Sequence, residues 1–199
     1  MNYNEEMKKI IKALDENNKL LLHSCCGPCS TAVLTRLKDH FDITVLYYNP
    51  NIEPFEEYLK RKEEQLKVLK EYNIKYMDID YLNEEYHAKV VGYEKEKENG
   101  LRCPICYKLR LEKTAKIAKE NNFDYFGTTL TVSPHKNSKV INEIGMSLEK
   151  EYNVKYLLSD FKKEEGYKLS IKLSKELDLY RQDYCGCLYS KNWKDDNNE

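Results

Sequence analysis

The chain has 199 residues, which is enough for one folded domain with a buried core. Its 33 basic and 34 acidic residues leave a net charge of −1, so the overall charge gives no argument for nucleic-acid binding, although it allows a local basic patch. No stretch reaches the length of a membrane span, and the first residues lack the apolar core of a signal peptide. We therefore expect a cytoplasmic protein with no membrane partner.

Short β-type runs alternate with helical patterns along the chain. Strands are expected at residues 19–23, 43–48, 74–80, 125–131 and 154–161. Helices are expected around residues 7–14, from about residue 30, from about residue 54, and at about 104–122, 136–152 and 166–179. The charged segment 83–100 is predicted to be an exposed excursion, and residues 180–199 are predicted to form a C-terminal tail.

This alternation predicts an α/β fold. We expect residues 1–199 to form a single domain with a mostly parallel five-stranded sheet and helices on both faces. In such sheets, ligands bind beyond the carboxyl ends of the strands, near the point where the strand order reverses. The segments 25–29, 47–51 and 128–137 each follow a predicted strand, so we expect them to meet on one rim of the sheet.

The seven cysteines fall into three tight groups and none lies outside them. The groups are Cys25, Cys26 and Cys29; Cys103 and Cys106; and Cys185 and Cys187, the last pair in the tail. In a cytosolic chain such spacing favours metal or redox chemistry over structural disulfides. The odd total also argues against a fully paired disulfide framework.

Two interpretations of these cysteines compete. Cys26-Gly27-Pro28-Cys29 has the active-site spelling of a thioredoxin, and a helix N-terminus would stabilise one thiol as the thiolate. A thiol–disulfide oxidoreductase using Cys26 and Cys29 is therefore the alternative function. A metal site accounts for more of the residues, because Cys103 and Cys106 also open a predicted helix. Structural zinc is possible for such pairs, but loops on the rim of a sheet favour a working site.

His135 is a candidate catalytic residue because it lies in 128–137, on the same expected rim as the first cysteine group. A lone histidine at the start of a helix is more often an ordinary structural residue than a catalyst, so the case for His135 depends on its place at this rim.

Five separated segments, in the same order, resemble the QueH family of cobalamin-independent epoxyqueuosine reductases. They are "HSCCGPC", "YYNPNIEPFEEYLKR", "RCPICYKLRLEKTA", "GTTLTVSPHKNS" and "YRQDYCGC". The resemblance extends from about residue 19 to residue 190, nearly the whole chain. It implies a fold similar to the nucleotide α-hydrolase (PP-loop-like, HUP) domains. Residues 25–29 stand where those relatives have a glycine-rich pyrophosphate loop, so ATP use is not expected.

The resemblance implies that the protein reduces the epoxide of epoxyqueuosine in tRNA, the last step of queuosine biosynthesis. The implied cofactors are a [4Fe–4S] cluster and a neighbouring mononuclear metal, expected to be iron, and the implied partners are tRNA and an external electron donor. The candidate cluster ligands are Cys25, Cys26, Cys103, Cys106, Cys185 and Cys187. Some family members have Asp at the position of Cys29, which makes Cys29 a ligand of the second metal in this hypothesis.

The remaining site residues follow from the same hypothesis. The second metal would act as a Lewis acid on the epoxide oxygen, and His135 or Tyr184 would protonate it. Lys136 and Arg181 would contact tRNA phosphates, and Tyr48 would stack on an extruded base.

Overall fold

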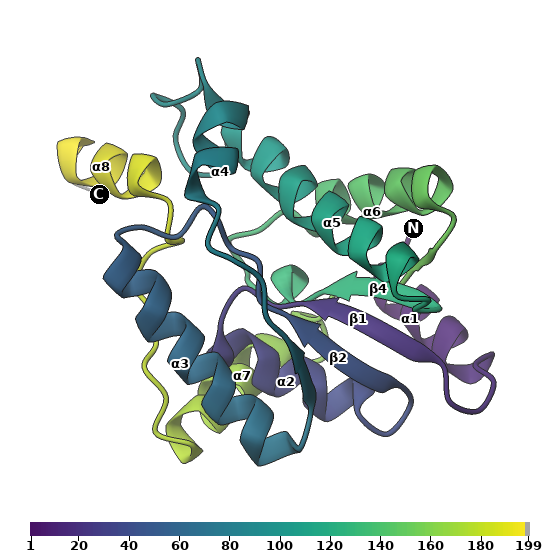
Figure 1. Ribbon diagram of the computed structural model, residues 1–199. Coiled ribbons are helices and arrows are strands. Elements are labelled where there is room, and N and C mark those ends of the chain that lie inside the picture. Colours follow the sequence, from purple (N-terminus) through teal and green to yellow (C-terminus); the bar gives the residue numbers. More distant parts are fainter. Residues whose placement is uncertain (198–199) are drawn as a thin grey trace.

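Five strands form one sheet in the computed structural model, which describes the backbone of residues 1–197 and the side chains of residues 1–192 (Figure 1). The strands are β1 (Lys19–His23), β2 (Asp42–Leu46), β3 (Lys75–Met77), β4 (Tyr125–Thr128) and β5 (Lys155–Tyr156). Their order is β3-β2-β1-β4-β5 and every pairing is parallel, which confirms the five-stranded, mostly parallel sheet expected from the sequence. The order reverses at β1, since β2 pairs with one edge of it and β4 with the other.

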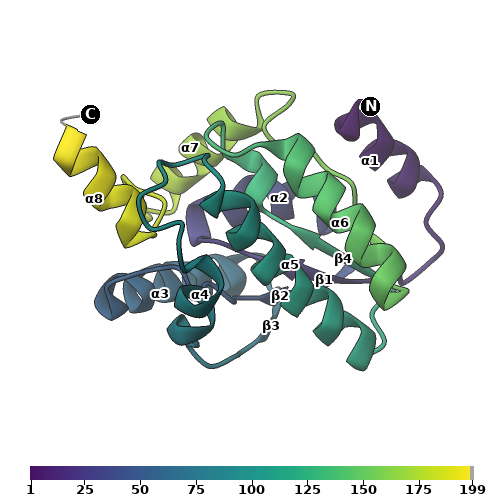
Figure 2. The same cartoon turned by 90° about the horizontal axis from the view of Figure 1, so that it is seen from above.

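Helices cover both faces of this sheet (Figures 1 and 2). In chain order they are α1 (Tyr3–Lys12), α2 (Gly27–Leu37), α3 (Phe55–Tyr72), α4 (Asn83–Val90), α5 (Arg102–Glu120), the 3-10 turn η1 (Leu130–Val132), α6 (Ser138–Tyr152), α7 (Gly166–Glu176) and α8 (Leu188–Asn197). Contacts join α2 to α3 and α7 on one face and α5 to α4 and α6 on the other. The structure describes no helix that is long and apolar enough to cross a membrane.

The central strand β1 divides its side chains between two cores. Leu20 and Leu22 pack with α1 and α2, whereas Leu21 packs with α5 and α6. This is the alternation of a strand buried on both faces, which explains why the sequence of β1 is an unbroken apolar run. The carboxyl end of β1 is thereby fixed at the middle of the sheet, and the first cysteine group follows it.

Strand β5 is shorter than the predicted 154–161. The chain after Tyr156 makes one more bond to β4, from the Leu157 amide to the Phe126 carbonyl (2.9 Å), and then leaves the sheet. Asn142 of α6 takes over, donating to the Ser159 carbonyl (2.8 Å) and accepting from the Ser159 amide (3.0 Å). A side chain therefore replaces the missing ladder partners.

The segment 83–100 is only partly the exposed excursion that the sequence predicts. Its first half is α4, which packs on α5 and buries Tyr86 and Val90. Residues 91–95 are exposed. Tyr86 and Val90 are four residues apart and therefore lie on the same face of α4. The charged residues around them made this apolar pattern hard to recognise in the sequence. The predicted tail 180–199 contains α8, and its last two residues, 198–199, lie outside the described residues.

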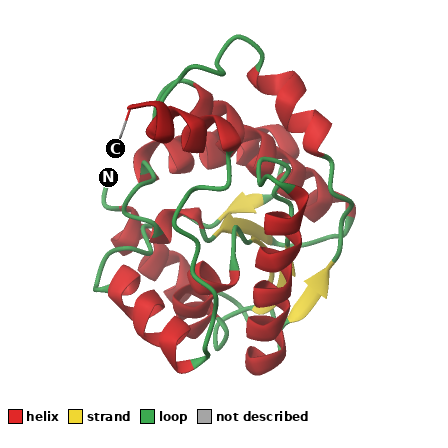
Figure 3. Cartoon of the chain, turned by 90° about the vertical axis from the view of Figure 1, so that its left-hand side faces the viewer, coloured by secondary structure: helices red, strands yellow, loops and turns green. Residues whose placement is uncertain are grey.

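Loops and the C-terminal helix α8 surround the side of the molecule on which the strands end (Figure 3). This is the side where an open parallel sheet binds its ligands.

Gly145 allows α6 to lie directly on the sheet, since a Cβ at this position would overlap the buried ring of Tyr156 in β5. We expect Gly145→Ala to lower the free energy of unfolding by about 1–3 kcal/mol through overpacking. Ser147→Ala, at an exposed position of the same helix, is the control and should change it by less than about 0.5 kcal/mol. Urea denaturation measures both, and equal stabilities of the two variants would contradict this packing.

Candidate metal centre and active site

The buried imidazole of His23 links the ends of the three central strands. Its Nε2 donates to the Tyr48 carbonyl after β2 (3.0 Å), and its Nδ1 accepts from the Thr128 hydroxyl at the end of β4 (2.9 Å). Burial lowers the pKa of His23 to about 3, so the ring is neutral at physiological pH. His23 therefore holds the rim together and is not itself a proton donor.

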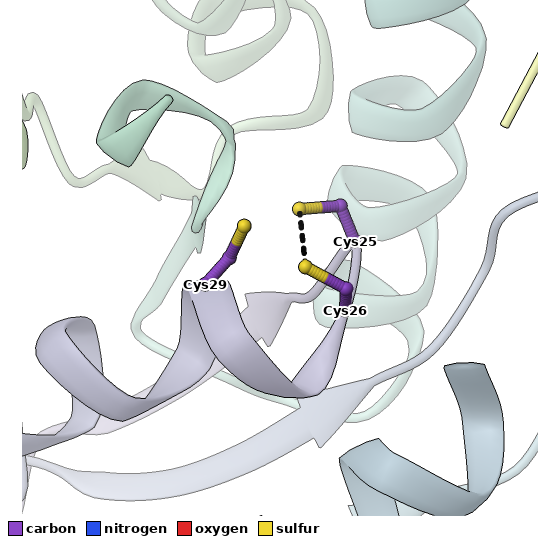
Figure 4. Close-up of side chains that lie close together, drawn as sticks. All are labelled: Cys25, Cys26 and Cys29. Carbon is purple, nitrogen blue, oxygen red and sulfur yellow. Dashed lines mark hydrogen bonds between the residues drawn. The ribbon is translucent and has the colours of Figure 1, made fainter. Parts of the chain in front are cut away.

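The loop after β1 places three thiols side by side. The Ser24 amide continues the pairing with β2 by donating to the Leu46 carbonyl (2.9 Å), and Asn49 donates to the Ser24 carbonyl (2.8 Å). Cys26 is the N-cap of α2 and Cys29 lies in its first turn. The Sγ atoms of Cys25, Cys26 and Cys29 all lie within 4.8 Å of one another (Figure 4).

The three thiols differ in pKa because they form hydrogen bonds to one another. Hydrogen bonds from Cys26 and Cys29 hold the pKa of Cys25 well below its usual range, and the charge of Lys136 acts in the same direction. Burial raises the pKa of Cys26 to about 12, although Gln182 donates to its Sγ (3.0 Å). The most acidic thiol is therefore Cys25, which lies outside the Cys-x-x-Cys pair.

A second group of cysteines lies beside the first turn of α5. Burial raises the pKa of Cys106 to about 12, and the thiolates of Cys185, Cys187 and Cys103 act in the same direction. The Asn99 amide donates to the Cys103 Sγ (3.2 Å). Cys106 and Cys187 share a small apolar cluster. The cysteines of the tail thus lie near those of α5.

Buried arginine and a glycine position the tail cysteines. Arg61 of α3 donates to the carbonyls of Tyr184 and Cys185 (both 3.2 Å). Gly186 has φ +103°, a conformation that glycine adopts without strain, and its carbonyl accepts from the Glu53 amide (2.9 Å). The turn directs Cys185 to the cavity described below, while Cys187 lies 2.9 Å from the Tyr86 hydroxyl.

A cavity of about 310 Å³ lies at this rim and brings the predicted site together. Cys25, Cys29 and Cys185 line it. So do four more residues named from the sequence, which are His135, Lys136, Arg181 and Tyr184. Cys103 lines an adjoining hollow that shares His135 and Lys136 with the cavity. The three cysteine groups, far apart in the sequence, therefore meet around one space.

Tyr48 does not fit its predicted role as a stacking platform for a base. It is 1% exposed, and its hydroxyl donates to Glu85 of α4. The helix α4 covers the loop after β2, which is why an aromatic residue on the expected rim is inside the core.

Tyr184 lines the cavity, but its hydroxyl is already engaged as a donor to the Glu53 carbonyl (2.6 Å). Burial raises the pKa of Tyr184 to about 12. His135 is exposed at the cavity and is the better-placed of the two predicted proton donors.

Asn51 and Arg110 also line the cavity, although neither was predicted from the sequence as a site residue. Asn51 is 1% exposed, and neither polar atom of its carboxamide has a partner in the described part of the chain. Arg110 is buried on α5, four residues after Cys106, and that helical spacing is the signal that could have identified it.

The residues fit a thiolate-bound metal. All seven cysteines are free, and three of their sulfur atoms converge within ligand distance of a single ion. Soft thiolates select iron–sulfur clusters, zinc or copper over harder ions. Buried polar atoms of four residues lining the same cavity have no hydrogen-bond partner in the described part of the chain, namely those of Asn49, Asn51, Arg110 and Gln182.

Comparison with known proteins identifies the family. The profile described as "Epoxyqueuosine reductase QueH" matches residues 20–193. The chain belongs to the QueH family. The epoxyqueuosine reductase QueH of Staphylococcus epidermidis is 43% identical, over 96% of this chain and 84% of that protein. The QueH of Thermotoga maritima is 38% identical, over 86% of this chain and 89% of that protein. The chain is thus an oxidoreductase, an epoxyqueuosine reductase, and the thiol–disulfide alternative is not favoured.

Solved structures show the fold independently. The U34-tRNA thiolase NcsA of Methanococcus maripaludis, solved with its [4Fe-4S] cluster, aligns with a TM-score of 0.58 at 15% identity, over 98% of this chain and 72% of NcsA. A predicted subunit of a tRNA methyltransferase from Methanocaldococcus jannaschii aligns with a TM-score of 0.51 at 17% identity, over 79% of this chain and 76% of that one. The PP-loop-like fold expected for the QueH family is confirmed.

The neutral state of His23 generates a pH prediction. The unfolded chain protonates this residue near pH 6.5, whereas the folded chain does so only near pH 3. The unfolded state thus binds the extra proton between these values, and the free energy of unfolding should fall by up to about 1.4 kcal/mol per pH unit below 6.5. His23→Gln should lack this component. Urea denaturation between pH 7 and pH 5 measures both slopes, and parallel slopes would contradict it.

Proposed function

We propose that this chain reduces the epoxide of epoxyqueuosine within tRNA to give queuosine, in the cytoplasm, with a [4Fe–4S] cluster and a second metal, iron. The observation that carries this proposal is the convergence of two groups of free cysteines on one cavity. A dithiol enzyme needs one such pair, and a structural zinc site needs four ligands. Seven free thiols, three of them lining this cavity, supply enough ligands for a cluster and a further ion.

The spatial grouping of the cysteines supports a division of the ligands between the two proposed metals. Cys103, Cys106, Cys185 and Cys187 would hold the cluster, because each of the other three thiols influences the acidity of Cys106. Cys25, Cys26 and Cys29 would hold the second metal, since their sulfur atoms already converge. Cys185 lines the same cavity as Cys25 and Cys29, so the two proposed metals would border one space.

Removal of the epoxide oxygen as water consumes two electrons and two protons and leaves a carbon–carbon double bond. The metal centre, when bound, supplies the electrons and a Lewis acid for the oxygen, and an external donor re-reduces it. His135 is our proposed proton donor, because it is exposed at the cavity while the Tyr184 hydroxyl is engaged with Glu53.

The cavity wall and its surroundings support a polar, anionic substrate. The Asn51 carboxamide offers a donor and an acceptor without partners, which suits the hydroxyl groups of the substrate's ring. Tyr167 lines both the cavity and a neighbouring hollow with Lys162, Lys163 and Lys168. We propose that tRNA phosphates bind these lysines and Arg181. Lys136 fits that role less well, since it is half-buried beside the thiols.

Replacement of a ligand tests the function directly. In a strain lacking this protein and any second epoxyqueuosine reductase, the wild-type gene should restore queuosine in tRNA. Cys185→Ser should leave epoxyqueuosine in place, with a rate in vitro at least about a hundredfold lower. Nucleoside analysis of bulk tRNA by mass spectrometry measures the outcome.

Ser147→Ala, at an exposed position of α6, is the matched control and should restore queuosine fully. Normal queuosine in the strain without the gene would overturn the proposed function. A protein that contains zinc and no iron after anaerobic reconstitution would overturn the proposed cofactors but leave the family assignment intact.

A further inference from the structure

Arg110 is a buried cation that lies next to Cys106 and to the cavity lined by Cys25, Cys29 and Cys185. It extends from α5 one turn after Cys106, and its Nε donates to the Cys106 carbonyl (3.2 Å). It also lines the cavity with Cys25, Cys29 and Cys185. Arg110 thus lies beside Cys106 on α5 and borders the space lined by Cys25, Cys29 and Cys185.

The burial of Arg110 calls for a partner that the described part of the chain does not supply at Nη2. The residue is 2% exposed, and its Nη2 has no hydrogen-bond partner in the described part of the chain. Desolvation disfavours a buried guanidinium whose donors are unpaired. In the other two buried arginines each terminal nitrogen has a partner, as Arg61 has in the carbonyls of Tyr184 and Cys185.

The cysteines around Arg110 identify the partner as an anion built on the thiols. Arg110 follows Cys106 by one turn of α5 and lines the cavity with Cys25, Cys29 and Cys185. Members of all three cysteine groups therefore surround it. A cluster held by thiolates carries net negative charge, and its sulfur atoms accept hydrogen bonds.

We propose that Arg110 is the counter-cation of the metal centre and that its Nη2 donates a hydrogen bond to a sulfur atom there. This inference rests on the metal content of the proposed function. Its consequence is electrostatic, because a fixed positive charge stabilises the reduced, more negative state of the centre. Arg110 would therefore raise the reduction potential and is a positioning and tuning residue, with no direct part in proton transfer.

The midpoint potential of the reconstituted holoenzyme tests this inference. We expect Arg110→Gln to lower the reduced-to-oxidised ratio at a fixed potential at least tenfold, which is about 59 mV for a one-electron couple. Arg110→Lys, which keeps the charge, should stay closer to the wild type than Arg110→Gln. A redox titration followed by electron paramagnetic resonance measures all three proteins.

Arg36→Gln is the matched control. It removes a half-buried guanidinium that binds the carbonyls of Phe161, Lys163 and Glu164, away from the cavity, and should leave the potential unchanged. An Arg110→Gln protein that retains its iron and has the wild-type potential would overturn the inference.

If Arg110→Gln does not fold or does not hold iron, the iron content of Arg110→Lys tests the inference instead. Retention of iron by the lysine variant supports the requirement for charge, and loss of iron from it as well would overturn it. A wild-type protein without iron would instead refute the proposed cofactors, so the two failures are distinguishable.

Discussion

The hydrogen bonds of His23 hold the carboxyl ends of β1, β2 and β4 in one place, and the arrangement of the thiols depends on that junction. Parallel strands leave their last backbone groups to be satisfied by whatever follows them. Here one neutral imidazole serves the end of β4 and the loop after β2, so Ser24 can continue to pair with β2. The loop that carries Cys25 and Cys26 therefore starts from a fixed point and turns directly into α2.

The rest of the rim is closed by buried guanidinium groups. Arg61 binds the carbonyls next to Cys185, and Arg102 binds those of Tyr93 and Glu94 and the hydroxyl of Ser190. Each arginine joins a helix to an irregular segment, and Arg102 also binds α8 through Ser190. Because a guanidinium has five donors in a rigid plane, one side chain can satisfy several carbonyls at once. Arg110 differs from these two because its Nη2 has no hydrogen-bond partner among the described residues, which is why we propose that it serves the metal centre.

The sequence predicted the parts of the fold that local pattern controls. The apolar run of β1, the cysteine spacing and the helices that follow the strands identified the sheet and the rim. The errors arose where tertiary contacts decide. Tyr48 is inside the core because α4 packs over it. No local pattern in residues 83–100 predicts that Glu85 will accept a hydrogen bond from the Tyr48 hydroxyl. Likewise β5 ends early because Asn142, distant in sequence, takes over the hydrogen bonds of Ser159.

The acidities of the thiols explain why the thioredoxin spelling does not give a thioredoxin. Exchange with a disulfide needs a thiolate at the first cysteine of the pair, exposed at the start of the helix. Here burial raises the pKa of that residue, Cys26, to about 12, and Cys25 takes the charge instead. The third thiol, Cys25, lies within 4.8 Å of the other two. Without a metal, three thiols so close together cannot all be deprotonated, whereas a bound metal ion would stabilise all three thiolates. In the proposed metal site the helix N-terminus would stabilise metal-bound thiolates, so Cys-Gly-Pro-Cys would serve ligation where an isolated pair serves exchange.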